Sequence, residues 1–250
     1  MEKDKKGYSR RDFLKTSGIA TGAVIGGGLI GGLVGYNVKR EGKTTAPEGG
    51  NKEGVPVQRL GGLKFFMSAN EFNVISQATE RIFPKDDLGP GAIELGVPFF
   101  IDNQLAGNYG SNAREYMQGP FYEGAPTQGY QSSLNRGEIF RQGIARLDEE
   151  AKKRFDKPFT ELEGKQMDEI LTAFQKDEVS MNGVTAEFFF KLLRMATLEG
   201  VYADPIYGGN TNMDAWRMKG FPGHHASYLQ DIEKDTYLEL EPKSVSEMGP

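Results

Sequence analysis

Apolar residues recur three and four positions apart through most of residues 68–199, and no segment shows the alternation of apolar and polar residues that is typical of a strand. Such spacing predicts amphipathic helices and leaves few strands from which to build a sheet. We therefore expect a mainly α fold, a compact helical domain of orthogonal or bundle type. It would carry long irregular loops rich in glycine and aromatic residues and follow an N-terminal signal or anchor helix.

The ends of the predicted helices are marked by capping residues. Ser68 with Glu71, and Thr160 with Glu163, have the spacing of a capping box. Thr185 is a candidate N-cap for the last helix. We expect helices over residues 68–83, 97–106, 134–155, 160–174 and 185–199.

Neighbouring residues refine three of these ends. Met67 and Phe72 have the spacing of a hydrophobic staple around the first helix. Glycine favours the end of a helix because it adopts left-handed backbone angles without strain. Gly107 is therefore the expected C-cap of the second helix, and Gly200 is expected to close the last one.

Two long stretches fit no helix. Residues 107–131 hold five aromatic residues, and residues 200–223 hold five glycines, two prolines and the only tryptophan of the chain. Long irregular loops are uncommon in compact domains and are often functional. Residues 107–131 are expected either to contact a partner or to pack on their own domain. Residues 200–223 are expected to wrap around the surface of the domain and not to span its core.

Composition excludes several kinds of site. The chain has no cysteine and two histidines, which excludes disulfides, thiolate metal sites and a cysteine nucleophile. Residues 1–40 carry a net charge of +5 and the rest of the chain −10. An acidic body argues against nucleic acid as the main partner. We expect no cofactor, no metal and no catalytic residue in this chain.

The first 40 residues have the pattern of an export signal. Residues 9–15 read SRRDFLK, in which Arg10 and Arg11 are followed by Phe13 and Leu14. Residues 18–38 then carry no charge. A basic region before an apolar stretch is typical of a targeting segment, and this heptad resembles a twin-arginine (Tat) signal. We expect recognition by the Tat translocase, and a final location in the periplasm or on the outer face of the cytoplasmic membrane.

The uncharged segment also has the length of a membrane span. Its 21 residues match the roughly 20 that a helix needs to cross a bilayer. Pro47 directly follows the nearest cleavage candidate, Thr44-Thr45-Ala46, which favours an uncleaved anchor over a cleaved signal; cleavage stays the alternative. The predicted organisation is a signal and possible anchor over 1–40, a tether over 41–62, a helical domain over 63–235 and a tail over 236–250.

Three pieces of the body carry a resemblance to a known family. One is Ile82-Phe83-Pro84 with residues 86–92, which read DDLGPGA, and the second is residues 100–105, which include Phe100-Ile101-Asp102. The most specific runs from Asp204 to Asn210, reading DPIYGGN, and continues with Trp216 and Gly220-Phe221-Pro222-Gly223. With these motifs the chain resembles the gluconate 2-dehydrogenase subunit 3 family over roughly residues 63–225.

The resemblance implies an accessory subunit of a membrane-associated, flavin-dependent sugar or sugar-acid dehydrogenase. In such complexes a large flavoprotein of the GMC type holds FAD and oxidises the alcohol, and a cytochrome c or a quinone receives the electrons. The small subunit carries the Tat signal and escorts its partner. Because Tat moves folded cargo, one signal can export both chains when they bind first.

The residues of the last motif are the predicted partner-binding residues. Aromatic residues are enriched at interfaces, so Tyr207, Trp216 and Phe221 are the strongest candidates; the alternative for Trp216 is a place in the core. The full predicted set is Asp204, Pro205, Tyr207, Gly208, Gly209, Asn210, Trp216, Phe221, Pro222 and Gly223.

The remaining polar candidates have a structural explanation that we favour. Asp86, Asp87 and Asp204 are carboxylates that could serve acid–base chemistry, but each also suits a turn or cap. His224 and His225 are adjacent, and neighbouring side chains rarely bind one metal ion. The alternatives to an accessory subunit are therefore an independent membrane-tethered binding module of the cell envelope and, with less support, a hydrolase that uses Asp204 or Asp87.

Overall fold

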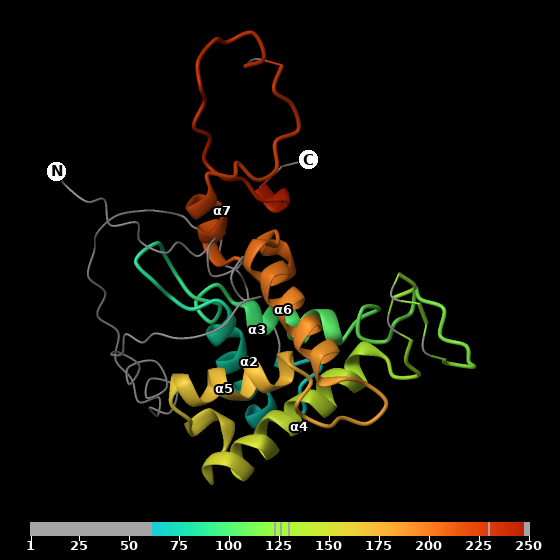
Figure 1. Ribbon diagram of the computed structural model, residues 1–250. Helices are drawn as coiled ribbons and strands as arrows, with labels where there is room; N and C mark the ends of the chain where they lie inside the picture. The colour runs from blue at the N-terminus through green and yellow to red at the C-terminus, as the bar shows by residue number, and fades with distance from the viewer. Residues whose placement is uncertain (1–61, 123, 126, 130, 230, 248–250) are drawn as a thin grey trace, which may run out of the picture. The chain divides into compact units, whose positions relative to one another are not determined.

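The computed structural model describes residues 62–122, 124–125, 127–129, 131–229 and 231–247. Within these residues the chain is helical and has no strand, which confirms the mainly α class (Figure 1). The longer helices are α2 (Ala69–Ile82), α3 (Val97–Leu105), α4 (Arg136–Phe155), α5 (Gly164–Gln175) and α6 (Ala186–Tyr202). A short α7 (Asp214–Lys219) and the 3₁₀ turns η2 (Phe159–Glu161), η3 (Pro205–Tyr207), η4 (Thr211–Met213) and η5 (Val245–Glu247) complete the order.

The predicted signal and anchor (residues 1–40) and all but the last residue of the predicted tether (41–62) lie outside the described residues. Among the helices that the structure describes, none combines the length and the apolar character needed to cross a membrane. The Tat signal, with Arg10, Arg11, Phe13 and Leu14, therefore stays a prediction.

Helix α2 begins as its sequence predicts. The Ser68 side chain accepts a hydrogen bond from the Glu71 amide at 3.2 Å, and the Glu71 carboxylate accepts one from the Ser68 amide at 3.2 Å. The predicted staple is wrong in one partner, because Met67 is 79% exposed. The rings that pack against Phe72 are those of Phe66 and Phe99, with 6.1 Å and 4.8 Å between ring centroids.

Two other predicted helix ends are shifted. The second helix ends in the C-cap Ala106, which keeps right-handed angles, so Gly107 is not the cap. The capping box predicted for Thr160 and Glu163 is wrong: residues 159–161 form a 3₁₀ turn, and Glu163 is itself the N-cap of α5, paired with Gln166. The residues around this break are compatible with a helix, so the local sequence did not predict the break.

Gly200 does not end the last long helix. Thr185 caps α6 as predicted, accepting a hydrogen bond from the Phe188 amide at 3.2 Å, but the helix continues to Tyr202 and Gly200 is buried inside it. A Cβ atom at position 200 would lie 2.9 Å from Cδ1 of Phe100 and 3.1 Å from Cγ1 of Val97. Glycine is needed at position 200 because α3 crosses α6 at close range. A Cβ atom essentially never lies within 3.0 Å of a heavy atom of another residue.

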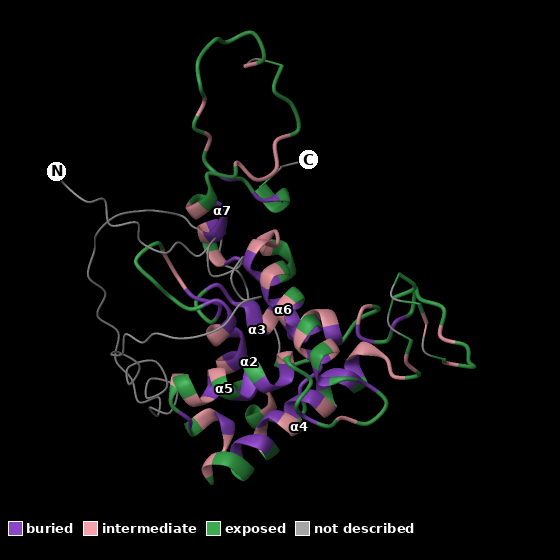
Figure 2. Ribbon diagram, viewed as in Figure 1, coloured by how far each residue is buried: buried purple, intermediate pink, exposed green. Residues whose placement is uncertain are grey.

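The core lies where the inner faces of α2 to α6 meet (Figure 2). Its centre is aromatic: the ring of Phe189 packs edge-on against Phe140 and Phe174, each at 5.7 Å between centroids. Gly143 on α4 makes room for the Phe189 ring, since a Cβ there would lie 2.3 Å from it. Such interdigitation is the packing that gives a helical domain a single arrangement.

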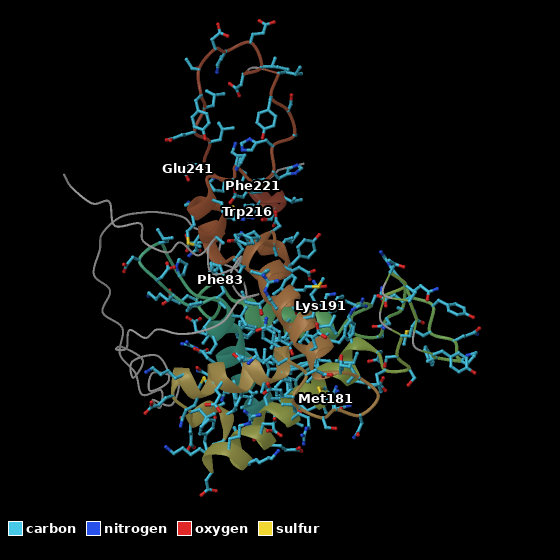
Figure 3. All side chains as sticks on the ribbon, in the orientation of Figure 1. Phe83, Met181, Lys191, Trp216, Phe221 and Glu241 are labelled. Carbon is cyan, nitrogen blue, oxygen red and sulfur yellow. The ribbon has the colours of Figure 1, made fainter. Side chains whose placement is uncertain are left out.

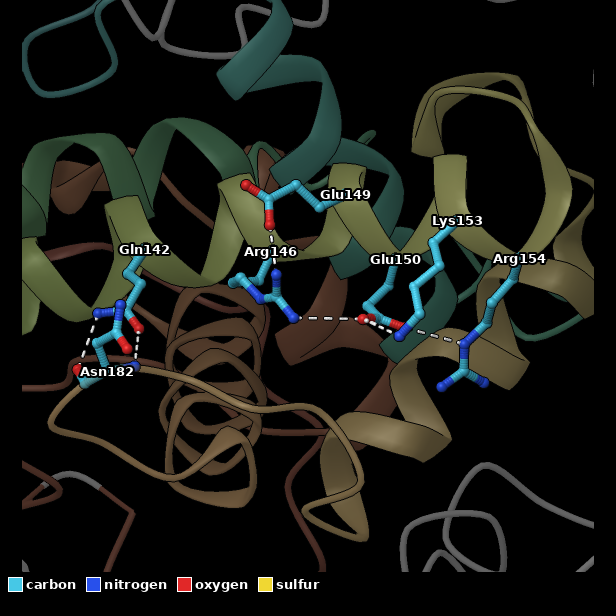
Figure 4. A network of polar contacts seen from close by, with 7 residues as sticks. All are labelled: Gln142, Arg146, Glu149, Glu150, Lys153, Arg154 and Asn182. Atoms are coloured by element: carbon cyan, nitrogen blue, oxygen red, sulfur yellow. Dashed lines mark hydrogen bonds and ion pairs between the residues drawn. The ribbon is translucent and has the colours of Figure 1, made fainter.

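A polar network covers the outer side of α4 (Figure 4). The nearly buried carboxylate of Glu150 receives hydrogen bonds from Arg146, Lys153 and Arg154 at 3.2–3.3 Å. Burial alone would raise the pKa of Glu150, but the hydrogen bonds from Arg154 and Lys153 bring that pKa below its ordinary value. The side chain of Gln142 joins α4 to the loop before α6 by pairing with the backbone of Asn182.

The aromatic stretch at 107–131 packs only in part on its own domain. Tyr109 packs on the core with the Arg136 guanidinium 4.5 Å above its ring, and burial raises the pKa of this tyrosine. Tyr116 and Tyr122 are exposed, and Phe121 with Tyr116 lines a small hollow beside Arg136. Tyr130 lies outside the described residues.

Candidate partner-binding surface

The three sequence pieces that are far apart in the chain meet at one end of the helical domain. The segment 204–223 lies against α3 and against the loop over residues 83–96 that precedes α3. Three contacts join them: the Thr211 amide donates to the Leu95 carbonyl at 3.1 Å, the Asn103 side-chain amide donates to the Tyr207 carbonyl at 3.5 Å, and Met218 packs against Gly89. The Phe83 ring also packs on the ring of Tyr202 at the end of α6, with 6.4 Å between centroids.

Glycines allow the backbones to approach this closely. A Cβ atom at Gly209 would lie 2.2 Å from the carbonyl oxygen of Gly200, and one at Gly96 would lie 2.9 Å from the carbonyl oxygen of Gly208. Gly96 and Gly208 also have φ angles of +76° and +95°, which residues with a Cβ rarely adopt. The glycine-rich composition of this segment is therefore a packing requirement.

Asn210 and Trp216 fix the segment from within. Asn210 is fully buried at a left-handed φ of 46°; its side chain donates to the Ala203 carbonyl at 2.9 Å and accepts from the Ala215 amide at 3.0 Å. Trp216, labelled in Figure 3, is 6% exposed and donates its indole N–H to the Tyr202 carbonyl at 2.9 Å. Both side chains thus hold the segment on the end of α6.

Asp204 ties this segment to the C-terminal part of the chain. One carboxylate oxygen accepts from the Ile206 amide at 3.0 Å, which caps η3, and from the Ser244 hydroxyl at 2.6 Å. The other oxygen accepts from the Val245 amide at 2.9 Å. We call this group of contacts the Asp204 latch. The turn role favoured for Asp204 is confirmed, and part of the predicted 236–250 tail returns to the domain through it.

A short backbone ladder beside the latch strengthens the same junction. The His224 amide donates to the Lys243 carbonyl at 2.8 Å, and the Lys243 amide donates to the Pro222 carbonyl at 3.1 Å. Gly223, with a φ of +70°, lies so close that a Cβ there would be 2.3 Å from the Lys243 oxygen. Pro222 and Gly223 therefore form the base on which the C-terminal residues close.

Other side chains of this end of the domain point to solvent. Ile206 and Tyr207 are each 58% exposed and Phe221 is 48% exposed, although its ring also packs edge-on against Trp216 at 5.3 Å. On the adjoining 83–96 loop, Leu88 and Ile93 are exposed as well. Exposed apolar side chains of this size make this end of the domain the candidate for contact with another molecule. We call these five residues the apolar end.

The structure separates the predicted partner-binding residues into two groups. Asn210, Trp216, Gly208 and Gly209 shape the segment, as does the Asp204 latch, whereas Tyr207 and Phe221 present their side chains to solvent. Ile206, Leu88 and Ile93 were not predicted, although Leu88 and Ile206 stood inside the quoted motifs. Ser244 and Val245 had no sequence signal, because a residue that meets Asp204 across 40 positions leaves no local pattern.

The carboxylates outside the latch have structural roles. Asp86 accepts the Leu88 amide at 2.7 Å and pairs with Gly89 in a tight turn, which confirms the turn role. Asp102 is buried and accepts three backbone amides, those of residues 64, 65 and 66, at 2.7–3.0 Å. It holds the start of the domain on α3. In the described part of the chain, no three His, Asp or Glu residues are grouped to hold a metal ion.

Comparison with known proteins gives one match. The family model described as gluconate 2-dehydrogenase subunit 3 matches residues 69–223, which is more than half of the chain and runs from the start of α2 to the glycine at the base of the C-terminal closure. No curated protein and no solved structure matches the chain.

Proposed function

Because the chain belongs to the gluconate 2-dehydrogenase subunit 3 family, an accessory subunit of such dehydrogenases, we propose that it binds and escorts the large flavoprotein subunit of a membrane-associated dehydrogenase. The observation that carries this proposal is the apolar end. A segment of the family match is held rigidly by Asn210, Trp216 and its glycines, and it exposes Ile206, Tyr207 and Phe221. A fixed surface with exposed aromatic and aliphatic anchors has the composition of an interface core.

The proposed division of work places the redox chemistry on the partner. The large subunit would be a GMC-type flavoprotein that holds FAD and oxidises a sugar or sugar acid, and electrons would pass to a cytochrome c or a quinone. The present chain would supply the Tat signal around Arg10 and Arg11 and hold the complex at the outer face of the membrane. The partner would have to fold around its flavin before export. Because Tat accepts folded cargo, an escort that carries the Tat signal would allow the folded partner to be exported.

Introduction of negative charge into the apolar end tests partner binding. Tyr207→Asp with Phe221→Asp should weaken capture of the large subunit at least about 30-fold, since interface anchors contribute about 2 kcal/mol or more. Tyr116→Asp is the matched control, because Tyr116 is 82% exposed on a different loop. Equal capture by the double variant and the control would refute this surface as the binding site.

Export is tested separately through the arginine pair. Replacing Arg10 and Arg11 with lysine keeps both charges but removes the guanidinium groups, and it should leave the large subunit in the cytoplasm together with this chain. Fractionation of cells that co-express both chains measures this. If the large subunit still reaches the outside, the escort role is wrong even when the two chains bind.

A further inference from the structure

Residues 224–242 form a closed loop that leaves the end of α7 and returns to it (Figure 1). We call it the C-terminal arm; it begins directly after the last residue of the family match, and Gln230 within it lies outside the described residues. Its base is closed by the ladder between residues 222–224 and Lys243 and by the Asp204 latch. Arg217 of α7 adds a hydrogen bond of 3.3 Å to Glu241 (labelled in Figure 3).

The arm is exposed although it carries large apolar side chains. Leu229, Ile232 and Tyr237 are 81%, 75% and 88% exposed, and Tyr228 is 45% exposed. Among the described residues, those from 226 to 240 hydrogen-bond only with one another, as in the turn where the Tyr228 carbonyl accepts from the amides of Asp231 and Ile232 at 2.9 Å. Exposure on this scale has a cost in water that burial against another molecule would remove.

The charge of the arm indicates what covers it. Five acidic residues and one lysine give residues 224–242 a net charge of −4, and the acids alternate with the apolar residues along 229–241. An acidic surface is repelled by anionic lipid headgroups. A protein groove with apolar pockets and a basic rim is the complementary partner.

We propose that the C-terminal arm is a second contact element that inserts into such a basic-rimmed apolar groove on the large subunit. This inference rests on the proposed function, because the arm and the apolar end share one junction. Asp204 caps η3, which exposes Ile206 and Tyr207, and the same carboxylate holds the returning end of the arm. The latch therefore fixes the arm beside the apolar end, and a single partner can contact both.

Replacement of the arm tests the inference on the full-length protein. In one variant residues 226–240 become a short Gly/Ser linker while His224, Lys243 and the latch are kept; a second carries Leu229→Asp and Ile232→Asp. Both should raise the dissociation constant for the purified large subunit by at least about tenfold, and Tyr116→Asp should leave it unchanged. Unchanged thermal unfolding shows that the domain is folded, because the arm adds nothing to its core.

Salt supplies a second readout. Binding of the wild-type chain should weaken as salt rises, since screening reduces the attraction between the acidic arm and its basic rim, and the linker variant should lose most of this dependence. Arm variants that bind the large subunit within about twofold of wild type, or an arm-dependent adhesion to anionic vesicles, would overturn the inference and leave the proposed function intact. A wild-type chain that binds no large subunit would overturn both.

Discussion

The Asp204 latch makes a prediction that can be worked out from its three hydrogen bonds. In Asp204→Ala the Ile206 amide, the Ser244 hydroxyl and the Val245 amide lose their acceptor. Hydrogen bonds to a charged group contribute about 1.5–3 kcal/mol each when they are well formed. Because Asp204 is only half-buried, we expect the three together to contribute about 2–4 kcal/mol to closing η3 and the C-terminal turn on the domain.

Hydrogen exchange measures this free energy at the amides concerned. Exchange at Val245 and Ile206 should accelerate by roughly 30- to 1,000-fold in the variant, which is the same energy expressed as an opening equilibrium. Amides in the core helices α2 and α5 should exchange as before, because the latch lies outside their packing. Asp235→Ala, at an exposed acid of the arm, is the control. Unchanged exchange at Val245 in Asp204→Ala would refute the latch.

Three further predictions concern the fold that supports the surface. Asp102→Ala leaves three backbone amides at the start of the domain without their acceptor and should reduce the free energy of unfolding in urea by about 3 kcal/mol or more. Gly209→Ala places a Cβ 2.2 Å from the Gly200 carbonyl oxygen and should destabilise the protein. At Gly107 a Cβ would lie 3.7 Å from the Gln104 carbonyl oxygen, and the same change there should cost under about 1 kcal/mol by thermal unfolding. Glu150 has a lowered pKa in the folded state, so its stabilisation is complete above the ordinary carboxyl value of about 4.3 and is lost as pH falls through the lower folded-state value. The difference in unfolding free energy between wild type and Glu150→Gln should therefore shrink on acidification; a constant difference would show that the ion pairs contribute nothing.

Local signals in the sequence predicted the helices well where neighbouring residues decide the backbone. The capping box of Ser68 with Glu71 and the cap at Thr185 are such cases, since each needs only contacts within one helical turn. The box expected at Thr160 failed because Phe159 and Thr160 form a 3₁₀ turn, and Glu163 caps the helix in its place. Gly200 was misjudged because the close crossing of α3, and not a helix end, requires a glycine there.

The site was predictable in its location but not in its construction. The glycine- and aromatic-rich composition of 200–223 singled out the segment, and Asp204 before proline indicated a turn. Which side chains face inward depends on tertiary contacts: Trp216 reaches the carbonyl of Tyr202, while the nearby Phe221 stays half exposed. Ser244, whose hydroxyl donates a hydrogen bond to Asp204, lies 40 residues later in the chain. No periodicity in the sequence relates two residues this far apart.

Purification of this chain from native membranes tests its role most directly. We expect a larger polypeptide to accompany it in constant ratio, and the complex to show the absorption of an oxidised flavin, which a sugar or sugar-acid substrate bleaches. The Tyr207→Asp, Phe221→Asp double variant should lose both the larger chain and the absorption. Recovery of this chain alone and colourless from wild-type membranes would contradict the account.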